Sequence, residues 1–129
     1  HTTSSEVRLL PGTIELPDVP VVADFAGNDA RLLHAAHENG AAAIVVQAFG
    51  GGRASPGVRD AYAEIARSGV PVLLSSRVPE GRVMGDVGGN EAGLVYAGDL
   101  PPHKARILLM LALQQPATAV QLQHLIDTH

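Results

Sequence analysis

The stretch that decides the fold is residues 97–113, which read AGDLPPHKARILLMLAL. It predicts the exit of a strand, a helix start signal and a helix over residues 105–113, in which residues 107–113 form an unbroken apolar run. A surface helix has an apolar stripe and a polar face, so a helix that is apolar all round has to be covered on more than one side. The run is too short to cross a bilayer. We therefore expect this helix to pack against its own sheet and against a partner, with Leu109 or Leu113 facing outside the domain.

Short apolar runs alternate with helical segments in the rest of the chain. The expected strands are residues 21–24, 43–47, 70–75 and 94–96. Each is a continuous apolar run, which is typical of strands that are covered on both faces of a parallel sheet. The alternation predicts an α/β fold with a small parallel four-stranded sheet and helices on both faces, doubly wound in the flavodoxin-like or Rossmann-like manner.

Helical periodicity is strongest after the predicted cap Ser55-Pro56. There, apolar residues recur at i, i+3, i+4, i+7 and i+8, namely Val58, Ala61, Tyr62, Ile65 and Ala66. The preceding helix is expected to begin at Asn28 or Asp29 and to end near Asn39. We expect its inner side to carry Leu32, Leu33, Ala35 and Ala36. The last helix is expected over residues 118–126, with an inner side formed by Leu122, Leu125 and Ile126.

Composition and charge argue against several classes of partner. The chain has 129 residues, which fits one domain. Its net charge is −4, so it lacks the basic surface that binds nucleic acid or anionic membranes. With two Phe, two Tyr and no Trp, it also lacks the aromatic platforms on which bases stack. There is no cysteine, and no segment has the length of a membrane span. We expect a cytoplasmic protein with neither a nucleic-acid nor a membrane partner.

The N-terminal part of the chain differs from the rest. Its first five residues are polar, and Pro11-Gly12 favours a turn between residues 7–10 and 13–16, which form either a hairpin or an extended arm. We expect residues 1–20 to be an N-terminal arm or an inter-domain linker. Residues 21–129 are then expected to form one α/β domain.

Candidate ligand sites lie where the predicted strands end, because ligands of a parallel sheet collect at the carboxyl ends of its strands. Gly50-Gly51-Gly52 fits either a cradle for a phosphate or carboxylate at a helix N-terminus or a flexible turn. The dinucleotide fingerprint is incomplete, because its third glycine position is Ser55. Ser75-Ser76-Arg77 fits either an anion site or a cluster of hydrogen bonds that organises the long loop expected over residues 76–91.

The residues by themselves show no catalytic or metal-binding constellation. His34 and His37 share a helix face, but no further ligands accompany them, so we expect exposed histidines, no metal site and no cofactor. Neither Ser75 nor Ser76 stands in a nucleophile elbow, and a serine nucleophile needs a base beside it. Lys104 is expected to be a surface lysine.

Three stretches resemble the C-terminal domain of bacterial-type L-asparaginases. They are A-A-A-I-V-V at residues 41–46, S-S-R-V-P followed by G-R-V at residues 75–83, and A-G-x-L-x-P-x-K-A-R followed by the apolar helix at residues 97–113. The last two occur in the order and at the spacing of the family. Residues 25–29 resemble the family's aromatic-Pro-Gly-x-Asp turn more loosely. The resemblance extends from Val21 to the C-terminus and implies the same small parallel-sheet domain.

The resemblance also implies three substrate-binding residues. The family's C-terminal domain completes the substrate site of a neighbouring subunit with an asparagine from a G-x-G-N-G-N loop and an acidic residue from a flexible loop. The first loop matches residues 48–53, which makes Gly52 and Arg53 candidates, and the acidic residue falls near Asp86. Arg53 stands where the family has asparagine. A guanidinium donates hydrogen bonds but accepts none, so Arg53 is suited to a substrate carboxylate.

The family's nucleophilic threonine lies in a G-G-T-I motif of a larger N-terminal domain. Gly12-Thr13-Ile14 lacks the preceding glycine, so the resemblance implies no catalytic residue in this chain. We expect a fragment or an isolated domain of an L-asparaginase that does not hydrolyse asparagine by itself. Its expected partners are its own N-terminal catalytic domain, further copies in a homodimer or homotetramer, and a small-molecule amide substrate.

Two other function classes stay open at this point. One is a free-standing flavodoxin-like module for ligand binding or regulation, in which the helix over residues 105–113 mediates homodimerisation, since a fold by itself does not define a function. The other is the glutamine-deamidating subunit of a transfer-RNA-dependent amidotransferase. An upstream domain with G-G-T-I and T-D-T motifs favours an amidohydrolase, and its absence favours the module.

Overall fold

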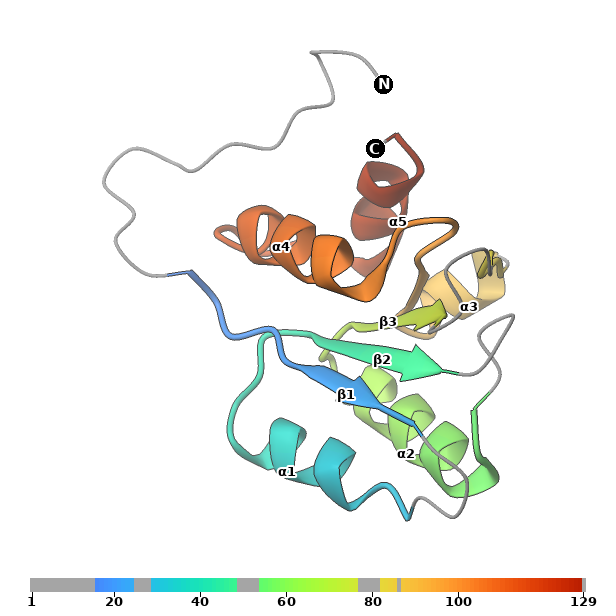
Figure 1. The fold of residues 1–129 in the computed structure, drawn as a ribbon. Helices are drawn as coiled ribbons and strands as arrows, with labels where there is room; N and C mark the ends of the chain where they lie inside the picture. The colour runs from blue at the N-terminus through green and yellow to red at the C-terminus, as the bar shows by residue number, and fades with distance from the viewer. Residues whose placement is uncertain (1–15, 25–28, 49–53, 77–81, 86, 129) are drawn as a thin grey trace.

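The fold is a parallel sheet between two helical layers (Figure 1). The computed structural model describes residues 16–24, 29–48, 54–76, 82–85 and 87–128. The strands, all parallel and adjacent in chain order, are β1 (Val21–Ala23), β2 (Ile44–Ala48), β3 (Val72–Ser76) and β4 (Leu94–Tyr96). The helices are α1 (Arg31–Glu38), α2 (Pro56–Arg67), α3 (Val87–Glu91), α4 (Pro102–Ala112) and α5 (Ala119–Asp127).

The two helical layers come from different parts of the chain. α1 and α2 follow β1 and β2 and lie below the sheet in Figure 1, whereas α4 and α5 follow β4 and lie above it. Right-handed crossovers that advance in one direction place their helices on one face, so the other face is covered by the chain after the last strand. This arrangement confirms the predicted α/β fold with helices on both faces. The order of the described strands does not reverse, so the predicted doubly wound arrangement is wrong, and these strands provide no topological switch point at which a ligand would be expected.

Strand side chains alternate between two apolar cores. Val46 and Leu74 belong to the core beside α1 and α2, and their neighbours Val45 and Leu73 belong to the core beside α4 and α5. Successive side chains of a strand point to opposite faces, so both residues of each pair are buried. This double burial explains why the strands read as continuous apolar runs.

The predicted start signal Ser55-Pro56 lies where α2 begins, although the Ser55 side chain makes no capping hydrogen bond, and a second start signal lies at α5. Ser55 is the N-cap residue of α2, and Pro56 occupies its first turn. Thr118 begins α5 with a capping box, in which its hydroxyl accepts a hydrogen bond from the Gln121 N–H and the Gln121 side chain accepts one from the Thr118 N–H. Each bond satisfies a backbone N–H that a helix start otherwise leaves without a partner.

The inner side of α1 is narrower than the sequence predicts. Leu33 is buried and Ala36 partly buried, but Leu32 is 58% exposed and Ala35 is exposed as well, so the prediction is wrong for these two residues. α1 has only eight residues, begins after Ala30 and packs against α2 along a single stripe. Residues three apart on a helix share a face, which places Ala30, Leu33 and Ala36 in the stripe and leaves Leu32 and Ala35 outside it.

Two further differences concern α3 and α4. α3 lies within the segment expected to be a loop. In α4, Leu109 is fully buried and Leu113 packs partly buried against the same core, so the expectation that Leu109 could face outward is wrong. The outward residue is Ile107, which is 54% exposed, because it lies two positions from Leu109 and therefore on the far side of the helix. In the described part of the chain, no helix combines the length and the apolar character needed to cross a membrane.

Candidate functional site

Three buried polar residues mark the carboxyl ends of the strands. Asp24 follows β1, and Ser75 and Ser76 end β3. A polar group loses its contact with water on burial and therefore needs a hydrogen-bond partner within the protein. The partners of these side chains show what this edge of the sheet holds together.

Asp24 joins the end of β1 to the start of α2. Its carboxylate is 3% exposed and accepts two hydrogen bonds from Ser55, one from the backbone N–H at 2.7 Å and one from the hydroxyl at 3.1 Å. Its own N–H donates to the carbonyl of Gln47 at 2.9 Å. A negative charge is also favoured at a helix N-terminus by the helix dipole. Asp24 therefore holds the start of α2 against the carboxyl end of β1.

Ser75 contributes to the structure of the sheet. Its side chain is fully buried, and its hydroxyl donates to the carbonyl of Val46 at 3.2 Å. A nucleophilic serine needs access to its substrate and a neighbouring base, and a hydroxyl buried against a carbonyl has no such access. This bond lies within the sheet and does not organise the loop expected over residues 76–91, so the loop-organising role stays a prediction. Arg77, which belongs to the same predicted cluster, lies outside the described residues.

A hollow of about 640 Å³ lies at the carboxyl end of β4, beside the start of α4. Arg82 and Asp99 line it and form an ion pair at 3.6 Å, and Lys104 lies on its α4 side. The side chains of Arg82 and Asp99 are 62% and 74% exposed, so water and salt screen the pair. The hollow can admit a small polar molecule. Its described lining includes the carboxylates of Asp99 and Asp127 but contains no serine, threonine or cysteine that could attack a substrate.

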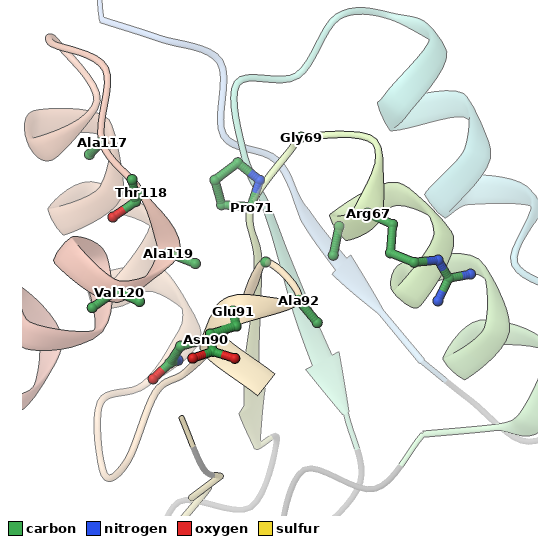
Figure 2. Close-up of a pocket in the computed structure, with 12 residues that line it drawn as sticks. Arg67, Gly69, Pro71, Asn90, Glu91, Ala92, Ala117, Thr118, Ala119 and Val120 are labelled. Carbon is green, nitrogen blue, oxygen red and sulfur yellow. The ribbon is translucent and has the colours of Figure 1, made fainter. Parts of the chain in front are cut away.

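A second cavity, of about 530 Å³, opens at the amino ends of β3 and β4 (Figure 2). Pro71 and Gly93, which immediately precede β3 and β4, lie between the end of α2 and the start of α5. Figure 2 shows the guanidinium of Arg67 pointing away from Thr118 and Ala119 on the far wall. The lining consists mainly of small apolar side chains. This cavity therefore lies away from the carboxyl ends of the strands, where the sequence predicts the ligand sites.

The two histidines of α1 behave as the sequence predicts in one case. His34 is exposed, whereas His37 is partly buried and its Nε2 lies 3.4 Å from the hydroxyl oxygen of Ser68, at the end of α2. Ser68 also donates to the carbonyl of Ile65 at 2.6 Å. This contact joins the C-terminal ends of two helices. Across the part of the chain that the structure describes, no three His, Asp or Glu side chains gather into a group that could hold a metal ion.

Among the residues that the structure describes, the pKa values of two titratable side chains, Asp29 and Tyr62, are shifted. The backbone N–H of Arg31 donates to the Asp29 carboxylate and holds its pKa below the usual 3.8, and the Arg31 guanidinium at 2.9 Å adds to this effect. Burial raises the pKa of the Tyr62 hydroxyl above its usual 10.0. A general acid or base works best with a pKa near the operating pH, and both shifts move the pKa further from neutral pH.

The three residues that the resemblance implies for substrate binding, Gly52, Arg53 and Asp86, all lie outside the described residues. Sequence reasoning did not single out Asp24 or its role. The available signal was an acidic residue directly after an apolar strand, at the edge where ligands collect. Its partner Ser55 is 31 residues away, so their contact depends on the packing of β1 beside α2.

The parallel-sheet domain described above matches a known family. Residues 18–126 match the family described as "Glutaminase/Asparaginase C-terminal domain". L-asparaginase 2 of Escherichia coli (strain K12) is 36% identical over 117 residues, which cover 89% of this chain and 34% of that protein. A subunit of the glutamyl-tRNA(Gln) amidotransferase of Halobacterium salinarum is 33% identical over 129 residues, which cover 94% of this chain and 30% of that protein.

A solved structure supports the same assignment. The probable cytoplasmic L-asparaginase from Campylobacter jejuni has a TM-score of 0.82 and 32% sequence identity, covering 88% of this chain and 35% of that one. The chain therefore belongs to the glutaminase/asparaginase C-terminal domain family, as its resemblance predicts. It spans about a third of the length of the curated relatives that it matches.

Proposed function

We propose that this domain is part of an L-asparaginase-type amidohydrolase, which converts asparagine and water to aspartate and ammonia. The family match over residues 18–126 carries the proposal, together with the 36% identity to an L-asparaginase. The described carboxyl ends of the strands are consistent with this proposal, because the buried hydroxyl of Ser75 in β3 is unsuited to nucleophilic attack. The nucleophile is then expected in the N-terminal catalytic domain of the parent protein.

Ammonia release tests this proposal directly. Asparagine and glutamine are supplied in turn to the full-length gene product and to this 129-residue chain. We expect ammonia from the full-length protein and none from the chain alone. Aspartate, which has the same backbone without the amide, serves as the control substrate. Ammonia release by the chain alone would show that it contains a nucleophile after all.

Gly52, Arg53 and Asp86 are the residues that we propose for the substrate site of a neighbouring subunit. The guanidinium of Arg53 suits the carboxylate of an amino acid, and the carboxylate of Asp86 suits its ammonium group. Gly52 lets the backbone approach a ligand closely. The assignment rests on the family match over residues 18–126, which include all three positions.

Arg53 can be tested in the full-length protein. Arg53→Ala should raise the KM for asparagine about tenfold with little change in kcat, because it removes one charge-assisted interaction with the bound substrate. Arg53→Lys keeps the charge without the two-pronged geometry and should fall between the two. The matched control is Arg67→Ala, which removes an exposed arginine of α2. A KM that does not respond to Arg53→Ala would remove this residue from the site.

We propose that the outer surface of α4 is covered in the parent protein, either by its N-terminal domain or by a second copy in a homodimer or homotetramer. Ile107 is 54% exposed there, and Met110 and Leu111 are partly exposed. Ile107→Glu in the full-length protein should therefore weaken assembly or domain packing, as seen by sedimentation and by limited proteolysis. Arg67→Glu places the same charge on the outer surface of α2 and should have neither effect. An Ile107→Glu protein that matches the wild type in both measurements would contradict the proposal.

A second candidate is the glutamine-deamidating subunit of a transfer-RNA-dependent amidotransferase, which the 33% identity to a subunit of the Halobacterium amidotransferase favours. In that case the full-length protein should release ammonia from glutamine rather than from asparagine. It should also pass that ammonia to a glutamyl group on transfer RNA when its partner subunit is present. Equal or higher activity with asparagine in the absence of transfer RNA favours the asparaginase.

Two proposals concern the organisation of the parent protein. We propose that residues 1–20 connect the catalytic domain to residues 21–129, and that Asp18 and Pro20 already lie against the sheet, where their carbonyls accept from Ala42 and Val45. We also propose a cytoplasmic location, which the name of the Campylobacter relative favours for that protein. Fractionation that finds the full-length protein outside the cytoplasm would contradict the location.

A further inference from the structure

A contact between an aromatic ring and two glycines joins β4 to the segment that contains α3. Tyr96, the last residue of β4, lies against Gly85 and Gly89. A Cβ atom placed on Gly85 would overlap the ring carbons of Tyr96, and one placed on Gly89 would overlap its hydroxyl oxygen. Both positions therefore need glycine as long as the ring stays in place. We call this the Tyr96–glycine contact.

The backbone of Tyr96 is held by Gln123 of α5. The Oε1 atom of Gln123 accepts from the Tyr96 N–H at 2.7 Å and from Nδ2 of Asn90 at 3.0 Å. The Nε2 atom of Gln123 donates to the Tyr96 carbonyl at 3.0 Å and to a carboxylate oxygen of Asp127 at 2.9 Å. Four hydrogen bonds orient this amide, so the strand end from which the ring projects has a defined position.

α3 has little stability of its own. It has five residues, Val87–Glu91, of which two are glycine, the poorest helix former after proline. Isolated helices of this length do not persist in water, so tertiary contacts must hold α3. Besides the Tyr96–glycine contact, the structure provides hydrogen bonds from Asn90 to the Leu94 carbonyl at 2.8 Å and to Gln123. These contacts explain why a helix forms where the local sequence predicts a loop.

We propose that Tyr96 is a positioning residue, whose ring holds Gly85 and α3 against the end of β4. In the sequence, Asp86 lies between Gly85 and Gly89, the two residues that the ring contacts. The consequence for substrate rests on the proposed function, which gives Asp86 a substrate contact. The contact itself does not depend on that function and can be tested separately.

Hydrogen exchange in this chain tests the contact. The N–H groups of Ala92 and Gly93 donate to carbonyls of α3, so their exchange reports whether α3 is formed. Tyr96→Ala should speed their exchange about tenfold or more, while Tyr96→Phe keeps the ring and should leave it close to the wild type. The N–H of Ser68, which donates to the Glu64 carbonyl of α2, is the internal reference and should not change. Unchanged exchange at Ala92 and Gly93 in Tyr96→Ala would overturn the proposal.

A pair of glycine substitutions separates the contact from helix propensity. Gly88 is an exposed residue of α3, so Gly88→Ala should slow the exchange about fivefold whether or not Tyr96 is present, because alanine favours a helix over glycine. Gly89→Ala has the same propensity gain but places its Cβ on the Tyr96 hydroxyl, so it should speed the exchange. In the Tyr96→Ala background Gly89→Ala should slow it instead. The same response in both backgrounds would overturn the proposal.

Kinetics of the full-length protein test the positioning role. Tyr96→Ala should raise the KM for asparagine severalfold with little change in kcat, and Tyr96→Phe should restore it. Faster exchange of α3 with an unchanged KM would show that the ring holds α3 without positioning a substrate residue, which overturns this role. A wild-type protein that releases no ammonia would instead refute the proposed function, and the exchange measurements would then decide the contact alone.

Discussion

Two helices on opposite faces of the sheet, α2 and α4, present different surfaces to the outside. The outer face of α2 is charged and exposed, with Arg59, Asp60, Glu64 and Arg67. The outer face of α4 begins with the exposed His103 and Lys104 and continues with apolar residues, of which Ile107 is 54% exposed and Met110 and Leu111 are partly exposed. A helix that faces water carries polar residues on its outer side. The outer surface of α2 is thus that of a helix that faces water, whereas α4 has the surface of a helix that another part of a protein covers.

The layers also differ in how they are joined to the sheet. The α4–α5 layer adds hydrogen bonds to backbone groups near both outer strands. Nε of Arg106 donates to the carbonyl of Val19, just before β1, at 2.8 Å, and Gln123 bonds both backbone groups of Tyr96 in β4. Backbone groups at the edges of a sheet otherwise need water or another strand as partner. These bonds hold α4 and its apolar surface in a defined orientation on the sheet.

The largest effect should separate the two sides of α4. Leu109 is fully buried against the sheet, so Leu109→Ala should lower the free energy of unfolding by about 2–5 kcal/mol through lost burial and a residual cavity. Ile107→Ala, on the outer side of the same helix, should change it by at most about 0.5 kcal/mol in this chain. Urea denaturation of both variants gives the two values. Comparable losses would show that the outer side of α4 is covered within this chain.

The next effect concerns the β4 end of the α4–α5 layer. Gln123→Ala leaves the N–H and carbonyl of Tyr96 without these partners and should cost about 1–3 kcal/mol of stability. Gln115→Ala is the control, because Gln115 is exposed beyond the end of α4 and should change stability by no more than about 0.5 kcal/mol. Thermal unfolding at matched concentration measures both. A Gln123→Ala protein as stable as the control would mean that water replaces the amide without loss.

The β1 end of the layer should respond less. Arg106 is partly exposed, and Arg106→Ala removes its hydrogen bond to Val19 together with some packing of its stem, for an expected loss of about 1–2 kcal/mol. Lys104→Ala, an exposed residue of the same helix, should have almost no effect. Denaturant midpoints measured side by side decide this, and identical midpoints would show that the bond to Val19 does not stabilise the fold.

The smallest effect concerns the start of α1, in the other helical layer, and depends on pH. The folded-state pKa of Asp29 is lowered by the Arg31 N–H and guanidinium, so its ionised form stabilises the start of α1 above the usual value of 3.8. That contribution disappears as the pH falls through the lowered folded-state pKa. An NMR titration should find the Asp29 midpoint below 3.8, and Arg31→Ala should raise it only part of the way because the backbone N–H remains. A midpoint at or above 3.8 in the wild type would refute the interaction.

The candidate site could be predicted only in outline. The order of the apolar runs predicts parallel strands, whose carboxyl ends lie together and form the expected place for a ligand site. The contacts within that edge join residues far apart in the chain, such as Asp24 with Ser55, and local patterns carry no record of such pairs. Gly52, Arg53 and Asp86 come from the family resemblance and stay predictions.

By itself, the sequence determined the class of fold, the positions of four strands, the buried stripe of α2 and the family of the chain. These features depend on periodicity, start signals and motifs that act over a few residues. Only the tertiary structure decided that Ile107 rather than Leu109 faces outward, that Leu32 is exposed, and that the Tyr96 ring lies against Gly85 and Gly89. In a helix that is apolar all round, the sequence does not indicate which side is buried, because the packing against the sheet decides this. A short helix with poor helix formers is stable only when distant residues contact it.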